Sequence, residues 1–185
     1  NIVGAFGLAG AAGLNAYIPL LIVALLGRAQ VLKLNEPFDV LTNWWVIGIL
    51  IVLLVIEIVV DKVPGADHIN DIVQTFIRPA AGAVLFAANA GIVKDASPVL
   101  ALSVGLLLAF GVHATKAMTR PVVNATTIGI GAPVISVAED VTAVIASLLS
   151  VYAPVLLIAF VIVMLYVGYR IYKRIRKIRL ARAAE

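Results

Sequence analysis

Long apolar runs separated by short polar turns make up most of the chain, and they predict membrane-spanning helices. The hydrocarbon core of a bilayer is about 30 Å thick, which takes about 20 apolar helical residues to cross. Residues 2–26 reach that length and predict a first crossing. Gly13 and Pro19 interrupt this run, because Gly removes side-chain bulk and Pro removes a backbone donor. We expect a kink or an unwound turn between them.

A second apolar run carries a charged residue close to its end. Asn43 suits the cap position of a helix, and Trp44 and Trp45 suit the membrane interface. The apolar residues 46–60 continue this helix into the membrane and include Glu57. We therefore predict a second helix with an ionisable side chain near its far end.

The stretch that follows allows two arrangements. Residues 61–70 are polar and contain a Pro-Gly pair, so we expect a break in the helix there. The apolar residues 80–93 come directly after Arg78 and Pro79 and are too few to span a bilayer alone. Either a kinked helix runs over residues 71–93 and buries Arg78, or residues 80–93 form a re-entrant half-helix.

Another helix is predicted after Ser97 and Pro98, which supply an N-cap hydroxyl and a proline at the first helical position. It continues over residues 99–112 until Pro121 ends or kinks it. Residues 122–137 are apolar but rich in Asn, Thr, Gly and Pro. This composition is typical of a discontinuous segment that lines a cavity rather than of a lipid-facing helix.

The last predicted helix begins at a capping box formed by Ser136 and Glu139 and runs to about Tyr169, with a kink at Pro154. Together these segments predict an all-α, polytopic transmembrane helical bundle. It has about six apolar segments, two of which are broken or re-entrant.

A weak internal repeat is a further expectation. Each irregular segment follows an Arg-Pro pair, and each pair lies downstream of a lysine at the end of a long span. The pairs are Arg78-Pro79 and Arg120-Pro121. Paired interrupted segments are typical of transporters with a site near the membrane midplane. The lysine-to-arginine spacing differs between the two copies, so chance similarity stays an alternative.

The composition agrees with a membrane protein and excludes several other classes. Hydrophobic residues make up 63% of the 185 positions and charged residues 13%, with a mean hydropathy of +1.10. Ordinary soluble domains carry about 25% charged residues. The absence of cysteine excludes disulfides, thiolate metal sites and cysteine nucleophiles. Residues 1–27 carry no charge, so we do not expect a secretory signal peptide.

Basic residues are concentrated at the C-terminal end. Residues 170–185 hold seven of the 14 basic residues and one of the 10 acidic residues, so the preceding part has a small net negative charge. A Lys/Arg cluster directly after an apolar span stays on the cytoplasmic side and attracts anionic lipid headgroups. We therefore expect a transmembrane domain, residues 1–169, and a basic cytoplasmic tail, residues 170–185. An even number of crossings would place Asn1 on the cytoplasmic side too.

Nucleic-acid binding is the alternative for such a basic tail. The tail lies directly beside Tyr166 and Tyr169, which suit the membrane interface. We therefore favour the membrane interpretation and expect no nucleic-acid partner.

Acidic residues gather around the first polar break at helical spacing. Glu57 and Asp61 are four residues apart and share a helix face, and a second pair repeats this spacing beside a histidine. The further members of this group are Lys62, Asp67, His68 and Asp71. They could bind a proton or a cation such as Mg²⁺, Ca²⁺, Zn²⁺ or Mn²⁺, although no metal motif is matched. The alternative is that the carboxylates cap helices and pair with the lysine.

A basic stripe is the second candidate. His113, Lys116 and Arg120 share one face of a continuous helix and, with Arg78, could bind a phosphate or carboxylate anion. The alternative is that these residues pair with buried acids and hold two halves of the bundle together. The acids available for this are Glu57, Asp61 and Glu139.

Asn15 and Tyr17, in the break of the first run, form the third candidate. Unwound carbonyls and an amide side chain are suited to a substrate or ion at the membrane midplane. An interhelical hydrogen bond is the alternative for Asn15. For Glu139 and Asp140 we expect helix capping rather than transport.

Several enzyme classes lack their characteristic residues. The sequence contains no H-E-x-x-H, no G-x-S-x-G, no Walker loop and no G-x-G-x-x-G that opens a βαβ unit. Intramembrane metalloprotease, serine hydrolase and ATPase activities are therefore not expected, and no cofactor is implied.

Several short motifs also resemble one family of small prokaryotic membrane proteins, known as domain of unknown function forty-one twenty-six. The resemblance covers nearly the whole chain and implies a membrane location, but no established activity. It is carried by Gly13-Leu14-Asn15-Ala16-Tyr17-Ile18-Pro19-Leu20, Glu57, Asp61-Lys62-Val63-Pro64, Asp67-His68, Asn70-Asp71 and Arg78-Pro79.

We therefore expect a multi-pass protein of the prokaryotic inner membrane that acts as a small transporter or channel-like translocator. Glu57, Asp61 and Asp71 would carry a coupling proton or cation, and Arg78 and Arg120 would hold an anionic solute. One short chain has too few helices to enclose a pathway fully, so a homodimer is expected. A lipid-phosphate-handling enzyme or flippase is one alternative, and a structural membrane subunit is another.

Overall fold

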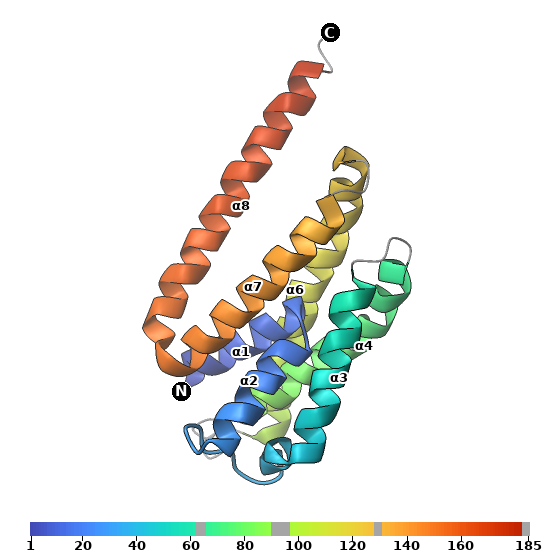
Figure 1. Ribbon diagram of the computed structural model, residues 1–185. Helices are drawn as coiled ribbons and strands as arrows, with labels where there is room; N and C mark the ends of the chain where they lie inside the picture. Colours follow the sequence, from blue (N-terminus) through green and yellow to red (C-terminus); the bar gives the residue numbers. More distant parts are fainter. Residues whose placement is uncertain (62–65, 90–96, 128–130, 183–185) are drawn as a thin grey trace.

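The computed structural model describes residues 1–61, 66–89, 97–127 and 131–182, which are almost entirely helical. The elements are α1 (Ile2–Leu14), α2 (Tyr17–Arg28), the 3₁₀ helix η1 (Phe38–Thr42), α3 (Trp44–Val60), α4 (Ala66–Ala87), α6 (Pro98–Thr127), α7 (Gly131–Tyr152) and α8 (Pro154–Arg182). The described residues include no strand. The predicted all-α bundle is therefore confirmed (Figure 1).

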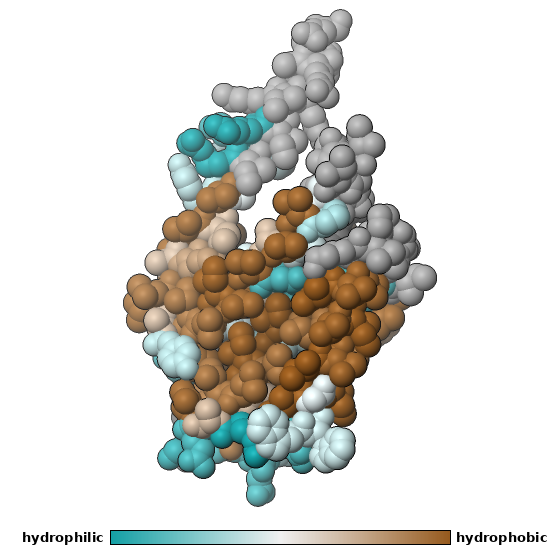
Figure 2. Space-filling view, viewed as in Figure 1, coloured by the Kyte–Doolittle hydropathy of each residue, from teal (hydrophilic) through white to brown (hydrophobic). Residues whose placement is uncertain are grey.

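Among the described helices, three are long and apolar enough to cross a membrane. These stretches are Pro98–Thr119, Pro133–Tyr152 and Pro154–Arg174, in α6, α7 and α8. Helices α1, α2 and α3 and the second half of α4 are apolar but shorter. Figure 2 shows a broad hydrophobic belt with hydrophilic residues near both ends of the molecule. The described residues thus contain seven apolar helical stretches where we expected six segments, and three of the seven have full spanning length.

The first apolar run forms a hairpin of two short helices, so the single crossing predicted for residues 2–26 is wrong. Helix α1 ends at Leu14, α2 begins at Tyr17, and the chain reverses between them (Figure 1). The side-chain oxygen of Asn15 accepts hydrogen bonds from the backbone N–H groups of Tyr17 and Ile18, at 3.0 and 3.1 Å. Asn15 thereby caps α2, and the predicted break in the run is confirmed.

The two open ends of this hairpin lie at the same end of the bundle. The side chain of Asn89, after α4, donates a hydrogen bond of 2.8 Å to the backbone carbonyl of Asn1. The guanidinium of Arg28, at the end of α2, lies 4.6 Å from the centre of the Trp44 ring, at the start of α3. The far end of α8 lies at the opposite end of the molecule (Figure 1). The start of α1 and the far end of α8 thus lie at opposite ends of the molecule, whereas an even number of crossings would bring them to the same end.

Proline does not interrupt α4 or α6. Pro79 lies inside α4, which runs through the buried Arg78 to Ala87. Of the two arrangements left open, the structure therefore agrees with one helix that buries Arg78 and not with a half-helix over residues 80–93, of which residues 90–93 lie outside the described part. Helix α6 likewise continues past Pro121 to Thr127, and α7 begins at Gly131. Residues 122–137 are therefore divided between two helices, as the predicted discontinuity requires, and residues 128–130 lie outside the described part. Membrane helices tolerate proline where neighbouring groups satisfy the freed carbonyls. Within the described residues, a divided segment follows Arg120-Pro121 but not Arg78-Pro79, so the two copies differ and this support for an internal repeat is missing.

The helix predicted to begin at Ser136 and run to about Tyr169 is two helices. Helix α7 already begins at Gly131, and α8 begins at Pro154, whose missing N–H cannot continue the preceding helix. Ser136 therefore lies inside α7, and the predicted capping box is wrong. Helix α8 continues beyond Tyr169 to Arg182.

The starts of α3 and α6 agree with the sequence. The side chain of Asn43 accepts a hydrogen bond of 3.1 Å from the backbone N–H of Trp45, as predicted for a cap. Pro98 is the first residue of α6. Local chemistry therefore sets these two boundaries.

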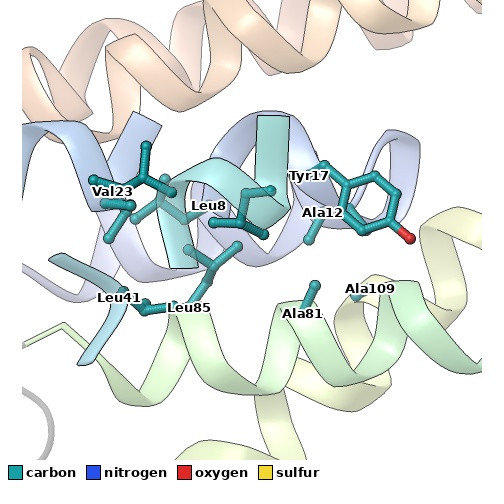
Figure 3. Close-up of a cluster of buried hydrophobic side chains, with 12 residues drawn as sticks. Leu8, Ala12, Tyr17, Val23, Leu41, Ala81, Leu85 and Ala109 are labelled. Carbon is teal, nitrogen blue, oxygen red and sulfur yellow. The ribbon is translucent and has the colours of Figure 1, made fainter. Parts of the chain in front are cut away.

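An apolar core joins the hairpin to α4 and α6. In Figure 3, Leu8 and Val23 of the hairpin lie over Leu85 of α4, within one cluster of buried side chains. Close approach of α4 to α6 depends on small residues, since a side chain at Gly82 would collide with Ala109. This packing fixes the hairpin so that its tip meets the polar interior.

Candidate functional site

Five ionisable residues are buried where the hairpin tip meets α3, α4, α6 and α7. Each exposes no more than 6% of its surface, and they are Glu57, Asp61, Arg78, His113 and Lys116. Charges inside a membrane are costly, so such residues pair with one another or serve a pathway for ions or solutes. The sequence singled out all five, and the structure places them in one region.

Arg78 is the centre of this group. Its Nη2 donates a hydrogen bond of 2.9 Å to Glu57 Oε1, and Arg78 and the Glu57 side chain are essentially inaccessible to solvent. Its Nη1 lies 3.0 Å from His113 Nδ1, while His113 Nε2 lies 3.0 Å from Thr75 Oγ1. The network thus joins α3, α4 and α6.

The contact with Arg78 sets the protonation of His113. A guanidinium has only donors, so His113 Nδ1 must be the acceptor in this bond. The imidazole is therefore neutral in this arrangement. A proton added at Nδ1 would remove the acceptor and place two positive charges together. Proton binding by His113 and its bond to Arg78 therefore exclude each other.

Within the part of the chain that the structure describes, three buried polar atoms of this region have no hydrogen-bond partner. They are Glu57 Oε2, Gln74 Oε1 and Arg78 Nε. Tyr17, at the hairpin tip, lies within electrostatic range of Glu57 and Arg78 and next to the Gln74 side chain. Leaving a buried polar atom unbonded costs about 1–3 kcal/mol, so these atoms retain the capacity for a further hydrogen bond.

A second buried ion pair holds the hairpin tip. Lys116 Nζ lies 2.7 Å from Glu139 Oε2 and donates a hydrogen bond of 3.0 Å to the backbone carbonyl of Leu14. This lysine therefore connects α6 and α7 to the last residue of α1. Glu139 pairs with Lys116, so the capping role expected for it is wrong.

Asn15 connects the tip to α7. Its Nδ2 donates a hydrogen bond of 3.0 Å to Asp140 Oδ1, while its side-chain oxygen caps α2. This interhelical bond was the alternative that the sequence left open. Asp140 bonds to Asn15, so capping of α7 by this carboxylate is wrong as well.

Asp61 joins three helices at the end of α3. Its two carboxylate oxygens accept hydrogen bonds from Asn70 Nδ2 at 2.8 Å and from Ser136 Oγ at 3.2 Å. Within the described residues, no group of three or more His, Asp or Glu side chains is arranged to hold a metal ion. Asp61 therefore acts here as an acceptor for neutral donors of α4 and α7.

Five predicted site residues cannot be placed in these networks. Lys62 lies outside the described residues, and the side chains of the other four do too, although their backbones belong to α4 and α6. These four are Asp67, His68, Asp71 and Arg120. Their proposed role in binding a cation or an anion stays a prediction.

Sequence reasoning missed the neutral polar partners of the site. They are Asn70, Gln74, Thr75 and Ser136. For Gln74 a signal was present, because it precedes Arg78 by four residues and so shares its helix face. For Ser136 no local signal exists, because its partner Asp61 is 75 positions away in the sequence.

The comparisons with known proteins identify a family but no activity. The sequence model of the family described as a domain of unknown function (DUF4126) matches residues 2–174. Neither a curated protein nor a solved structure matches the chain. The match covers nearly the whole chain and confirms the resemblance seen in the sequence. The chain therefore belongs to the family described as a domain of unknown function (DUF4126).

Proposed function

We propose that this protein is a small transporter or channel-like translocator of the prokaryotic inner membrane. It would couple the movement of an ion or small anionic solute to protons. The observation that carries the proposal is the complete burial of Arg78 with Glu57 and His113 at the tip of a broken helix. Transporters use broken helices to bring backbone ends to a site near the membrane midplane.

The charges of the buried region favour proton or cation coupling. Among the described residues, four carboxylates surround two permanent cations, Arg78 and Lys116. Excess negative charge in a medium of low polarity is relieved when a proton or another cation binds. Proton binding at His113 would release Arg78 from one partner and free a guanidinium fork for an anion. This exchange is a mechanism by which a proton and an anion could move together.

The membrane orientation of the protein is part of the same proposal. Arg170, Lys173 and Arg174 follow the apolar part of α8 and line one pocket together with Tyr166 and Tyr169. Clusters of this kind stay cytoplasmic and bind anionic lipid headgroups. We therefore propose a cytoplasmic C-terminus, and a homodimer that completes the walls of the pathway.

Solid-supported-membrane electrophysiology on purified proteoliposomes tests this function. The challenges are proton, metal-cation and organic-anion gradients, applied to wild type and to Glu57→Gln and Arg78→Gln. The exposed Glu36 and Arg28 allow matched controls, Glu36→Gln and Arg28→Gln. We expect a current in wild type and in both controls that is lost in the folded site variants. Loss of folding yield alone would favour a structural subunit.

A second candidate function is the handling of a lipid phosphate by an enzyme or flippase. A groove of about 610 Å³ between α8 and α1, α6 and α7 has an almost entirely apolar lining, with Thr142 as an exception. It includes Leu14, whose carbonyl binds Lys116. The acyl chain of a lipid is apolar along its whole length and therefore suits this lining.

Phosphorus analysis of the purified protein distinguishes the two functions. A lipid that copurifies in a fixed ratio, and is lost in Lys116→Met but not in Lys33→Met, would favour lipid handling. Lys33 is exposed and lies outside the groove, so it provides the matched control. Absence of bound lipid together with a proton-dependent current would favour the transporter.

A further inference from the structure

We infer that Glu57, Gln74 and Arg78 form a binding site for one buried water molecule, through which Glu57 receives its proton. The role of the proton rests on the proposed transport function, whereas the water site itself does not. Among the described residues, three buried atoms have no hydrogen-bond partner, and they are Glu57 Oε2, Gln74 Oε1 and Arg78 Nε.

The three residues are held close to one another by the fold. Glu57 and Arg78 are in direct contact through Oε1 and Nη2, at 2.9 Å. Gln74 lies one helical turn before Arg78 in α4, so both side chains project from the same face. Tyr17 lies next to Gln74 and within electrostatic range of the other two. We therefore place the three unsatisfied atoms in one polar region beside the hairpin tip.

The chemistry of these atoms selects water. Glu57 Oε2 and Gln74 Oε1 are acceptors, whereas Arg78 Nε carries a donor hydrogen. A ligand must therefore donate two hydrogen bonds and accept one. A metal cation cannot accept a hydrogen bond and would lie beside a guanidinium, and a simple anion cannot donate. One water molecule meets all three demands, and buried waters in proteins make about three hydrogen bonds.

Such a water would connect Glu57 to the proton supply. Its oxygen accepts the Nε–H of Arg78 with one lone pair and keeps the other lone pair free. When a proton binds to the free lone pair, the water can release the proton of its other O–H bond, the one that points at Glu57 Oε2, to that oxygen. The water stays neutral overall, and the carboxylate becomes a carboxylic acid. Gln74 is a positioning residue in this step, because it orients the second O–H.

Infrared difference spectroscopy on the full chain in lipid nanodiscs tests the site. Spectra recorded before and after a pH drop, in H₂¹⁶O and in H₂¹⁸O, reveal water bands because only water O–H stretches shift with the oxygen isotope. The variants are Gln74→Met, which keeps the length of the side chain without its amide, and the shorter Gln74→Asn. Gln30→Met is the matched control, since Gln30 lies in an exposed turn.

We expect an isotope-sensitive band in wild type and Gln30→Met that disappears in Gln74→Met. In Gln74→Asn, the shorter side chain holds its amide oxygen farther from the water, so the water band should shift. Proton uptake by Glu57, read from its carboxyl C=O band, should slow at least tenfold in Gln74→Met. A wild type without the isotope-sensitive band, or an unchanged band in both folded Gln74 variants, would overturn the inference. Because none of these readouts needs a transported solute, they separate the water site from the transport function.

Discussion

Two buried ion pairs surround the hairpin tip, and they differ in how completely their atoms are bonded. In the pair of Arg78 and Glu57, one guanidinium nitrogen and one carboxylate oxygen have no hydrogen-bond partner among the described residues of the protein. In the pair of Lys116 and Glu139, the described residues show no such atom, and Lys116 also binds the carbonyl of Leu14. The first pair thus keeps bonding capacity inside the bundle. We call the second pair, Lys116 and Glu139, the brace, because Lys116 holds the end of α1 in place.

This difference suggests how one small bundle divides its charges between function and structure. A brace gains nothing from unused donors and acceptors, because each one costs free energy when it is buried. A site that binds and releases protons needs such groups. We therefore interpret the Arg78 pair as the working site and the Lys116 pair as its support.

The largest effect is expected from breaking the first pair on one side. Glu57→Leu leaves the Arg78 guanidinium buried without a counter-charge, which typically costs about 3–5 kcal/mol. The free energy of unfolding, measured by reversible denaturation in mixed detergent micelles, should fall by this amount. The matched change at the exposed Glu36 should leave it within about 0.5 kcal/mol.

The double variant Glu57→Leu/Arg78→Leu sharpens the comparison. Replacing both members of a buried pair by apolar residues is often neutral or stabilising, so most of the lost stability should return. Proton-dependent current should not return. A double variant that is as unstable as Glu57→Leu would show that Arg78 has other partners that matter more than Glu57.

A smaller effect is expected from breaking the brace. Lys116→Met leaves Glu139 without its cation, but the Glu139 side chain is 14% exposed and can draw on water. We expect a loss of about 1.5–3 kcal/mol, as for a hydrogen bond to a charged group, and a current of at least half the wild-type value. Complete loss of current in a folded Lys116→Met protein would reverse the roles that we assign to the two pairs.

A third effect concerns the hairpin tip itself. Asn15→Ala removes the cap of α2 and the hydrogen bond to Asp140. Loss of a cap costs about 1 kcal/mol. Hydrogen exchange in the first turn of α2 should become faster than in the first turn of α3, which Asn43 caps. Equal protection of the two turns would contradict the capping role of Asn15.

The smallest effect is expected at the open end of the hairpin. Arg28→Gln removes an exposed cation–π contact with Trp44, worth about 0.5–1 kcal/mol. Thermal unfolding should shift only slightly, and the current should equal that of wild type. A large loss of current would mean that the pathway extends to this end of the bundle.

The sequence predicted the features that depend on local chemistry. Asn43 and the Ser97-Pro98 pair mark helix starts, and the break near Asn15 follows from Gly and Pro in an apolar run. Burial of Glu57 and Arg78 follows from charges placed inside apolar segments. These features are set within a few residues of the chain.

The features that the sequence could not supply depend on distant contacts. Residues 17–26 are apolar whether the chain continues across the membrane or turns back, so the hairpin has no signature of its own. Pro121 predicts a helix end by local rules, but groups of neighbouring helices can bond to the backbone carbonyl that a proline leaves without its N–H donor. Ser136 fits the pattern of a helix cap, but in the structure its hydroxyl donates a hydrogen bond to Asp61 at the end of α3. Packing decides each of these cases.

The most direct test of the account is the proton-driven current of the folded double variant Glu57→Leu/Arg78→Leu, compared with wild type and Lys116→Met in the same proteoliposomes. If the Arg78 pair is the working site, the double variant folds, keeps most of its stability and carries no current, while Lys116→Met still conducts. A double variant that conducts like wild type would contradict the account, because the first pair would then be a second brace.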